Sequence, residues 1–353
     1  MVKNLKEVVL ATISYFDIFE YPLTLLEIKQ YIINPQRLFP KSPPIGDISL
    51  SQIANEIDRL SNLGDISEEN GFYFLTPPLK RRVLNNMPSH VSTTDNNSFS
   101  TAGFETRIER EKISTQKFRR LLKLARYFQA VPYLRGIFVS GSLAISNASP
   151  ESDYDVLVIM RENRLYLGRI FLSLAASLLR ARRTRYQKFA PDKFCFNHYL
   201  CDKNLHLNHE SIYNAQTYAT LKPILISHQL YDEFYRSNLW INKFVYNFKP
   251  GYESNIRKVK PSRFLKNIAT FSEKVLDGRF GDFLEGLAKK YQQKRISNNP
   301  ATYESGGRIV FNDVELEFHP RSFESRVISR YNQFLHTHWG AYVSLEHDSG
   351  LAK

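Results

Sequence analysis

Two aspartates lie one residue apart at the start of an apolar run, in Asp153-Tyr154-Asp155 followed by VLVIM. In a β-strand, residues i and i+2 point to the same side, so both carboxylates would project together, with Cα atoms about 6.5 Å apart. Two like charges at this spacing repel each other unless a cation lies between them. Mg²⁺, or Mn²⁺ in its place, takes hard oxygen ligands and is commonly shared between carboxylates and substrate phosphates. The pair therefore predicts metal-dependent chemistry on a phosphate-bearing substrate.

A turn of small residues precedes the aspartates. Gly141-Ser142 ends the apolar run at residues 136–140, and ten residues separate it from Asp153. Glycine has no Cβ, so a phosphate can approach its backbone, and the serine hydroxyl and the N–H groups of a following short helix favour an anion. Each motif alone is common by chance, and an aspartate pair also marks solvated strand ends. The combination predicts a nucleotide site or its evolutionary remnant.

The segment at residues 136–160 resembles the signature of the polymerase-beta-type nucleotidyltransferase superfamily. That signature is a hydrophobic strand, Gly-Gly or Gly-Ser, a spacer, and then Asp-hydrophobic-Asp/Glu. By this resemblance Gly141 and Ser142 bind the nucleotide, and Asp153 and Asp155 are the catalytic metal ligands, while Tyr154 departs mildly from the usual aliphatic residue. More loosely, the chain resembles uncharacterised prokaryotic proteins that join an N-terminal winged helix to such a domain.

The superfamily often carries a third carboxylate on a neighbouring strand, where it commonly activates the attacking hydroxyl. The next strand candidate, residues 193–200 (KFCFNHYL), contains no acid, and Asn197 lies at its middle. Asp192 and Asp202 flank it, in positions where aspartate favours turns. Loss of the third acid favours transfer to an already nucleophilic acceptor, or nucleotide binding without turnover.

Four segments would position this site: a winged-helix domain at residues 1–86, a flexible linker at 87–103, a nucleotidyltransferase core at 104–250 and a mostly helical region at 251–353. The fold class expected is α+β, with a small mixed sheet in the core. In the first segment, Thr24 and Glu27 predict a capping box, and Ser49 or Ser51 can cap a third helix. Asn70-Gly71 predicts a hairpin. The linker is rich in Ser, Thr, Asn and Asp and poor in apolar residues.

The charge of the first segment disfavours DNA binding. Residues 1–88 carry nine Lys/Arg and ten Asp/Glu, whereas the whole chain has a formal charge of +13. Because phosphate neutralisation drives most nucleic-acid affinity, we expect protein contacts or a structural role here. The positive charge lies later, in a helix at residues 105–129 with a basic, solvated face and in a stretch from Arg161 to Lys193. These cations suit a triphosphate or a polyanionic acceptor.

Two later segments are expected to be helical. Residues 213–235 look helical, and the apolar residues of a helical region at 261–295 are interpreted as core contacts.

The remaining residue types indicate the compartment and exclude some kinds of site. The two cysteines, Cys195 and Cys201, form no disulfide framework, which favours the reducing cytoplasm. The apolar stretch at residues 167–179 is too short to span a membrane, and the N-terminus has no signal-peptide cleavage pattern. His206/His209 and His336/His338 lack nearby carboxylates at metal-ligand spacing, so surface or packing roles are favoured.

The leading hypothesis is a nucleotidyltransferase that uses two-metal magnesium chemistry. It would move a nucleoside monophosphate from a nucleoside triphosphate to an acceptor and release pyrophosphate. The acceptor, whether a small molecule, a protein side chain or an RNA end, is not specified by the sequence. The alternative is a catalytically weak or inactive nucleotide-binding adaptor, whose winged helix contacts a protein rather than DNA.

Overall fold

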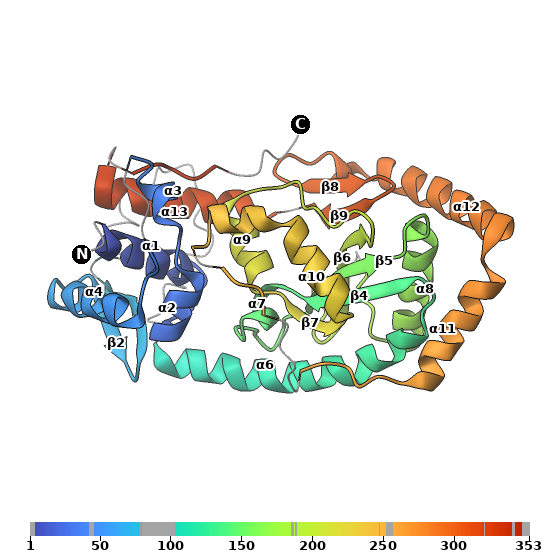
Figure 1. Ribbon diagram of the computed structural model, residues 1–353, viewed down its shortest axis with the longest axis horizontal. Helices are drawn as coiled ribbons and strands as arrows, with labels where there is room; N and C mark the ends of the chain where they lie inside the picture. Colours follow the sequence, from blue (N-terminus) through green and yellow to red (C-terminus); the bar gives the residue numbers. More distant parts are fainter. Residues whose placement is uncertain are drawn as a thin grey trace.

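A six-stranded mixed β-sheet forms the centre of the computed structural model, with strand order β7-β4-β5-β6-β9-β8 (Figure 1). β5 and β6 run parallel, and the other neighbouring pairs are antiparallel. The expected combination of helices with a mixed sheet is confirmed. The strands are β4 (Leu134–Val139), β5 (Tyr154–Met160), β6 (Phe194–Cys201), β7 (Lys222–Leu225), β8 (Arg308–Phe311) and β9 (Glu315–His319). The structure describes residues 4–41, 46–77, 79, 103–184, 187, 189–246, 248–251, 257–320, 322–340 and 343–347.

Helices cover both faces of this sheet, because its strands alternate apolar side chains between two clusters. Leu157 and Ile159 of β5 join one cluster with α9, α10 and α13, whereas Val156 and Val158 join another with α6, α8 and α12. This period of two is expected of a strand buried on both sides. The helices are α6 (Phe104–Ala125), α7 (Gly141–Ala144), α8 (Leu165–Leu178), α9 (Ile212–Ala219), α10 (His228–Ser237), α11 (Arg263–Val275), α12 (Gly278–Ser297) and α13 (Glu324–Trp339), with 3₁₀ turns η1 (Arg126–Ala130), η2 (Leu239–Lys243) and η3 (Pro300–Thr302).

The N-terminal elements form a helical unit with a small three-stranded sheet, at the left of Figure 1. Both predicted caps are present: Thr24 and Glu27 form a capping box at α2, and Ser49 forms one with Gln52 at α4. The Asn70-Gly71 turn joins β2 to β3 with positive φ at both residues, as hairpin turns require. The elements are α1 (Leu5–Asp17), β1 (Leu23–Thr24), α2 (Leu25–Tyr31), α3 (Pro35–Leu38), α4 (Leu50–Asn62), β2 (Ile66–Glu69) and β3 (Phe72–Leu75).

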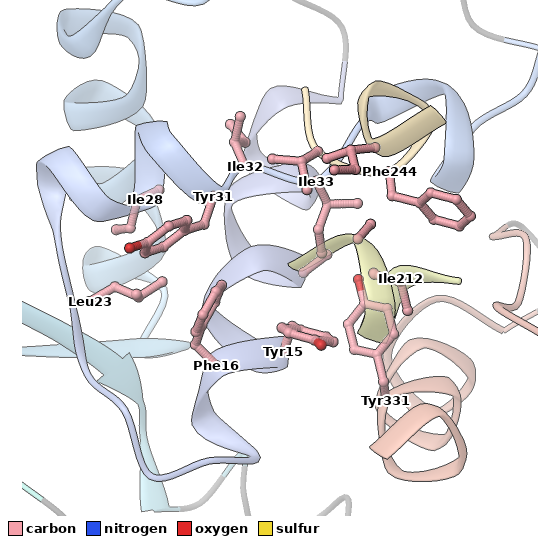
Figure 2. Packing of buried hydrophobic residues seen from close by; sticks show 14 of the residues in the cluster. Tyr15, Phe16, Leu23, Ile28, Tyr31, Ile32, Ile33, Ile212, Phe244 and Tyr331 are labelled. Atoms are coloured by element: carbon pink, nitrogen blue, oxygen red, sulfur yellow. The ribbon is translucent and has the colours of Figure 1, made fainter. Parts of the chain in front are cut away.

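This N-terminal unit shares its hydrophobic core with the helices on one face of the central sheet. Tyr15 of α1 meets Tyr331 of α13 edge to face, with ring centroids 5.5 Å apart (Figure 2). Ile33 forms an isolated antiparallel bridge with Val245. The cluster runs continuously from α1 to α9, α10 and α13. The domain boundaries stay predictions, and the proposed linker lies outside the described residues apart from Gly103.

The basic face of α6 differs from the solvated face that the sequence predicts. Arg107 and Lys117 are buried, at 5% and 4% relative exposure. Arg107 pairs with Glu27 at 2.8 Å, and Lys117 pairs with Asp192 at 2.9 Å. A buried cation needs a partner carboxylate, and each of these has one from another part of the chain. Parts of this basic face therefore join α6 to the N-terminal unit and to the loop that precedes β6.

Two other sequence expectations are wrong. The segment at residues 213–235 is not all helical, because residues 222–225 form strand β7 at the edge of the sheet beside β4. The large apolar residues predicted as core contacts in α11 are mostly exposed: Phe264 and Phe271 are 72% and 68% exposed, and Val275 is 58% exposed. Periodicity identifies an apolar face of a helix, but only packing decides what that face meets.

Within the ranges given above, no helix combines the length and the apolar character that crossing a bilayer demands.

Candidate functional site

The Gly141 turn and the Asp155 carboxylate are adjacent because β4 and β5 pair up to that point. Val139 lies opposite Val156, and the Ser140 N–H donates to the Asp155 carbonyl oxygen at 2.9 Å. Gly141 then takes φ +66°, a left-handed conformation that favours glycine. A Cβ at this position would lie 2.9 Å from Oδ2 of Asp155. The missing side chain thus leaves room for the carboxylate.

Ser142 follows in α7, a single helical turn, and is half-buried. Its carbonyl oxygen accepts the N–H of Asn147 at 2.7 Å, which closes the turn. Within the described part of the chain, the Ser142 hydroxyl has no hydrogen-bond partner. The structure thus places Gly141 directly beside Asp155, with Ser142 as the next residue of the turn.

Asp153 and Asp155 form one group with Cys195 of the parallel strand β6. One ligand atom from each lies within 4.8 Å of the other two. Asp155 and Cys195 are directly opposite in the β5–β6 register, which explains the contact. The donor set contains two carboxylates, as the sequence predicts, and a thiol that the sequence did not indicate as part of the site.

The electrostatics of this group favour a cation. Burial, followed by the neighbouring Asp153 charge, raises the pKa of Asp155 to about 7, against the lowering effects of Arg183, Cys195 and Asn197. Burial and the charges of Asp155 and Asp153 also raise the pKa of the Cys195 thiol. The thiol is therefore protonated at neutral pH and is a poor metal ligand. The two carboxylate oxygens fit Mg²⁺ or Mn²⁺, which prefer oxygen donors.

Arg183 supplies a positive charge that sequence reasoning left unassigned. Its Nη1 forms an ion pair with Oδ2 of Asp153 and lies 3.8 Å from Sγ of Cys195. The segment after α8 is held beside β6 by the Arg183 N–H, which donates to the Phe194 carbonyl at 3.0 Å. The sequence signal was the density of basic residues from 161 to 193, but nothing in that run distinguishes Arg183 from its neighbours.

Asn197 takes the place where a third carboxylate was considered. Its Nδ2 donates to Oδ1 of Asp155 at 3.0 Å. In the β5–β6 ladder, Phe196 pairs with Val156 and His198 pairs with Leu157, so Asn197 is the extra residue of a β-bulge. A bulge redirects side chains locally. It allows Cys195, Asn197 and His198 to lie on the same side of the sheet as Asp155.

The two aspartates that flank β6 have structural partners instead. Asp192 accepts hydrogen bonds from Lys117 at 2.9 Å, Arg120 at 2.6 Å and the Tyr154 hydroxyl at 3.0 Å. Asp202 accepts the Glu162 N–H at 2.9 Å. Tyr154 is fully buried, so its ring occupies the hydrophobic place between the two aspartates while its hydroxyl is held by Asp192. Both flanking acids anchor loops, as turn aspartates do.

No protein-family model matches this chain, and the searches of curated proteins and of solved structures likewise find no match.

Proposed function

We propose that this protein is a nucleotidyltransferase that transfers a nucleoside monophosphate from a nucleoside triphosphate to an acceptor. The proposal rests on the juxtaposition of Gly141 with Asp155, since a small-residue turn and a pair of carboxylates meet at one end of the sheet. The antiparallel pairing of β4 with β5 brings the turn to Asp155, and the parallel pairing of β5 with β6 brings Cys195 to the same carboxylate.

Each residue has a role in this proposal. Asp153 and Asp155 would hold Mg²⁺ or Mn²⁺, and the ion would supply charge neutralisation for the triphosphate and the leaving pyrophosphate. The Gly141 backbone and the Ser142 hydroxyl bind the outer phosphates. Arg183, which pairs with Asp153, would also contact phosphate oxygens of a bound nucleotide.

The reaction forms a bond between the acceptor oxygen and the α-phosphorus. It breaks the bond between the α-phosphorus and the oxygen that bridges to the β-phosphate, and pyrophosphate leaves with that oxygen. The acceptor proton passes to solvent, because Asn197, an amide, stands beside Asp155 where a carboxylate base was considered. Catalysis then depends on positioning and on charge complementarity. This requirement favours an acceptor that is already a good nucleophile, whether a small molecule, a protein side chain or an RNA end.

The proposal is tested by pyrophosphate release with Mg²⁺, each of the four ribonucleoside triphosphates and a panel of acceptors. Transfer of label from an α-labelled triphosphate into cell extract identifies the acceptor class. Asp153→Asn and Asp155→Asn should each abolish release, whereas Asp58→Asn, an exposed position on α4, should not. Undiminished turnover in both site variants would end the proposal.

The alternative function is a nucleotide-binding adaptor that does not turn its ligand over. Two observations favour it: Asn197 stands beside Asp155 in place of a third acid, and Arg183 already pairs with Asp153. Calorimetry with Mg²⁺ and each triphosphate, followed by the label-transfer screen, separates the two functions. Binding without transfer to any acceptor supports the adaptor.

A further inference from the structure

A second cluster of metal-binding residue types lies on the same face of the sheet, further along β6 and on its neighbour β9. His198 belongs to β6, while Glu315 and Glu317 belong to β9. One ligand atom from each lies within 4.8 Å of the other two. All three residues are buried, at 4%, 3% and 0% relative exposure. His198 and Glu317 are direct cross-strand partners, which fixes their approach.

The two carboxylate oxygens of Glu317 have different surroundings. Oε1 accepts from the Arg308 guanidinium at 2.9 Å and 2.8 Å. Oε2 is buried and has no hydrogen-bond partner within the described structure. Nε2 of His209 lies 3.7 Å from Oε2, beyond hydrogen-bond distance. A buried carboxylate oxygen without a hydrogen-bond donor is costly, so this atom indicates a missing ligand.

Acidic side chains gather around this cluster. Glu315, Glu317 and Glu324 are all buried. Arg308 pairs with Glu317 and, at 2.6 Å, with Glu324, whereas Glu315 lies beside His198. A divalent ion would place positive charge between Glu315 and Glu317. Buried charges are tolerated when they are paired or coordinate a metal.

We propose that His198, Glu315 and Glu317 form a structural site for a divalent transition-metal ion of the Zn²⁺ type. Imidazole nitrogen with carboxylate oxygen is a donor set that suits Zn²⁺ and its neighbours, whereas the Asp153–Asp155 pair suits the harder Mg²⁺. Nε2 of His198 already lies 3.0 Å from Oε1 of Glu315. His209, from the loop before α9, supplies a fourth donor near Oε2 of Glu317.

Surrounding residues hold the ligands in place. Arg308 holds Glu317 through Oε1 and leaves Oε2 without a hydrogen bond. The Tyr218 hydroxyl lies 3.4 Å from Nδ1 of His198 and so presents Nε2 to the glutamates. Such partners of metal ligands commonly fix the ligand atom that faces the ion. The ion would tie β6 and β9 to the α9 region, and its binding would couple to folding because the ligands are buried.

The test uses the full-length protein, purified without chelator after expression in zinc-supplemented medium, with metal content measured by mass spectrometry. We expect about one Zn²⁺ per chain, and removal by chelator should lower the Tm by about 5 °C or more. Co²⁺ added to the stripped protein should give the visible absorption of a four- or five-coordinate site. His198→Gln and Glu317→Gln should lose that absorption, whereas the double variant Asp153→Asn/Asp155→Asn should keep it.

Three results would overturn the site. The first is wild-type protein, stripped of metal, that shows no Co²⁺ absorption and no dependence of its Tm on zinc. This result needs no variant, so it does not depend on whether a variant folds. Absorption that survives in folded His198→Gln and Glu317→Gln places the ion elsewhere. Absorption lost in the Asp153/Asp155 double variant assigns the ion to the proposed nucleotide site. Nucleotide turnover is a separate readout, so this site and the proposed function fail independently.

Discussion

Gly141 and Asp155 are so close that a side chain at residue 141 would displace the carboxylate: a Cβ there lies 2.9 Å from Oδ2 of Asp155. The positive φ of Gly141 adds about 1–2 kcal/mol of strain for any other residue. We therefore expect Gly141→Ala to lower the free energy of unfolding by about 2 kcal/mol and to weaken Mg²⁺ binding at least tenfold. Denaturant unfolding and calorimetry measure the two effects. Gly286→Ala, inside α12 with nothing within 4 Å of its Cβ, is the control and should be neutral or stabilising.

The ion pair between Arg183 and Asp153 predicts opposite effects on metal and on nucleotide. Arg183→Gln removes a cation that competes with Mg²⁺ for Asp153, so affinity for Mg²⁺ alone should stay the same or rise. Affinity for Mg²⁺-triphosphate should fall about tenfold, because a charge-assisted contact to phosphate is lost. Calorimetric titrations with Mg²⁺ and then with Mg²⁺-triphosphate measure both. Arg180→Gln, at an exposed position of the same segment, should change neither, and weaker Mg²⁺ binding in Arg183→Gln would contradict this role.

Asn197 stabilises the ionised form of Asp155 through its Nδ2, which donates at 3.0 Å. Asn197→Asp would replace that donor with a third negative charge. Without divalent ions, we expect the free energy of unfolding at pH 8 to fall by about 1–3 kcal/mol. Mg²⁺ should restore more stability to this variant than to wild type, which thermal unfolding with and without Mg²⁺ reveals. Asn204→Asp, exposed after β6, controls for the charge change, and equal Mg²⁺ stabilisation of wild type and Asn197→Asp would speak against metal binding at Asp155.

The pKa of Asp155, raised to about 7 first by burial and then by Asp153, makes Mg²⁺ binding depend on pH. Below pH 7 the carboxyl is protonated, and Mg²⁺ must displace the proton. Affinity should therefore rise with pH and level off above 7, with about a tenfold difference between pH 6 and pH 8. Calorimetry at these pH values measures it. In Asp155→Asn the residual affinity should lose this dependence, and a wild-type affinity that is flat across the range would refute the assignment.

Asp192 predicts a different pH effect, on stability. Burial acts to raise its pKa, but hydrogen bonds from Lys117, Arg120 and Tyr154 lower it overall. A lowered folded-state pKa stabilises the protein above the unfolded value of 3.8, and this stabilisation is lost as the pH falls through the folded value. Asp192→Asn should lower the free energy of unfolding by about 1 kcal/mol at pH 7, since the group is 28% exposed.

The difference between wild type and Asp192→Asn should shrink as the pH falls below 3.8. Denaturant unfolding at several pH values follows both curves, with Asp58→Asn as the exposed control. A difference that stays constant down to acid pH would mean that Asp192 acts through packing rather than through its charge.

Local patterns were sufficient for most elements near the candidate site. The apolar run after Asp155 predicts β5, the run before Gly141 predicts β4, and both helix caps follow from residues within one turn of each other. These features depend on neighbours in sequence, so they can be read without knowing the fold. Strand β7 escaped the same reasoning because it is only four residues long and contains Pro223. A short strand of this kind is recognised by its partner β4 rather than by its own pattern.

The sequence by itself determined that two carboxylates and a small-residue turn lie at adjoining strand ends, because a period of two and a fixed spacing require it. Only the tertiary structure decided that Arg183, Cys195 and Asn197 complete that group. It also decided that the buried histidine of β6 meets two glutamates more than a hundred residues later in the chain. These contacts depend on strand order, on one β-bulge and on which face each helix covers. They are set by the packing of distant segments, and no local pattern of residues encodes them.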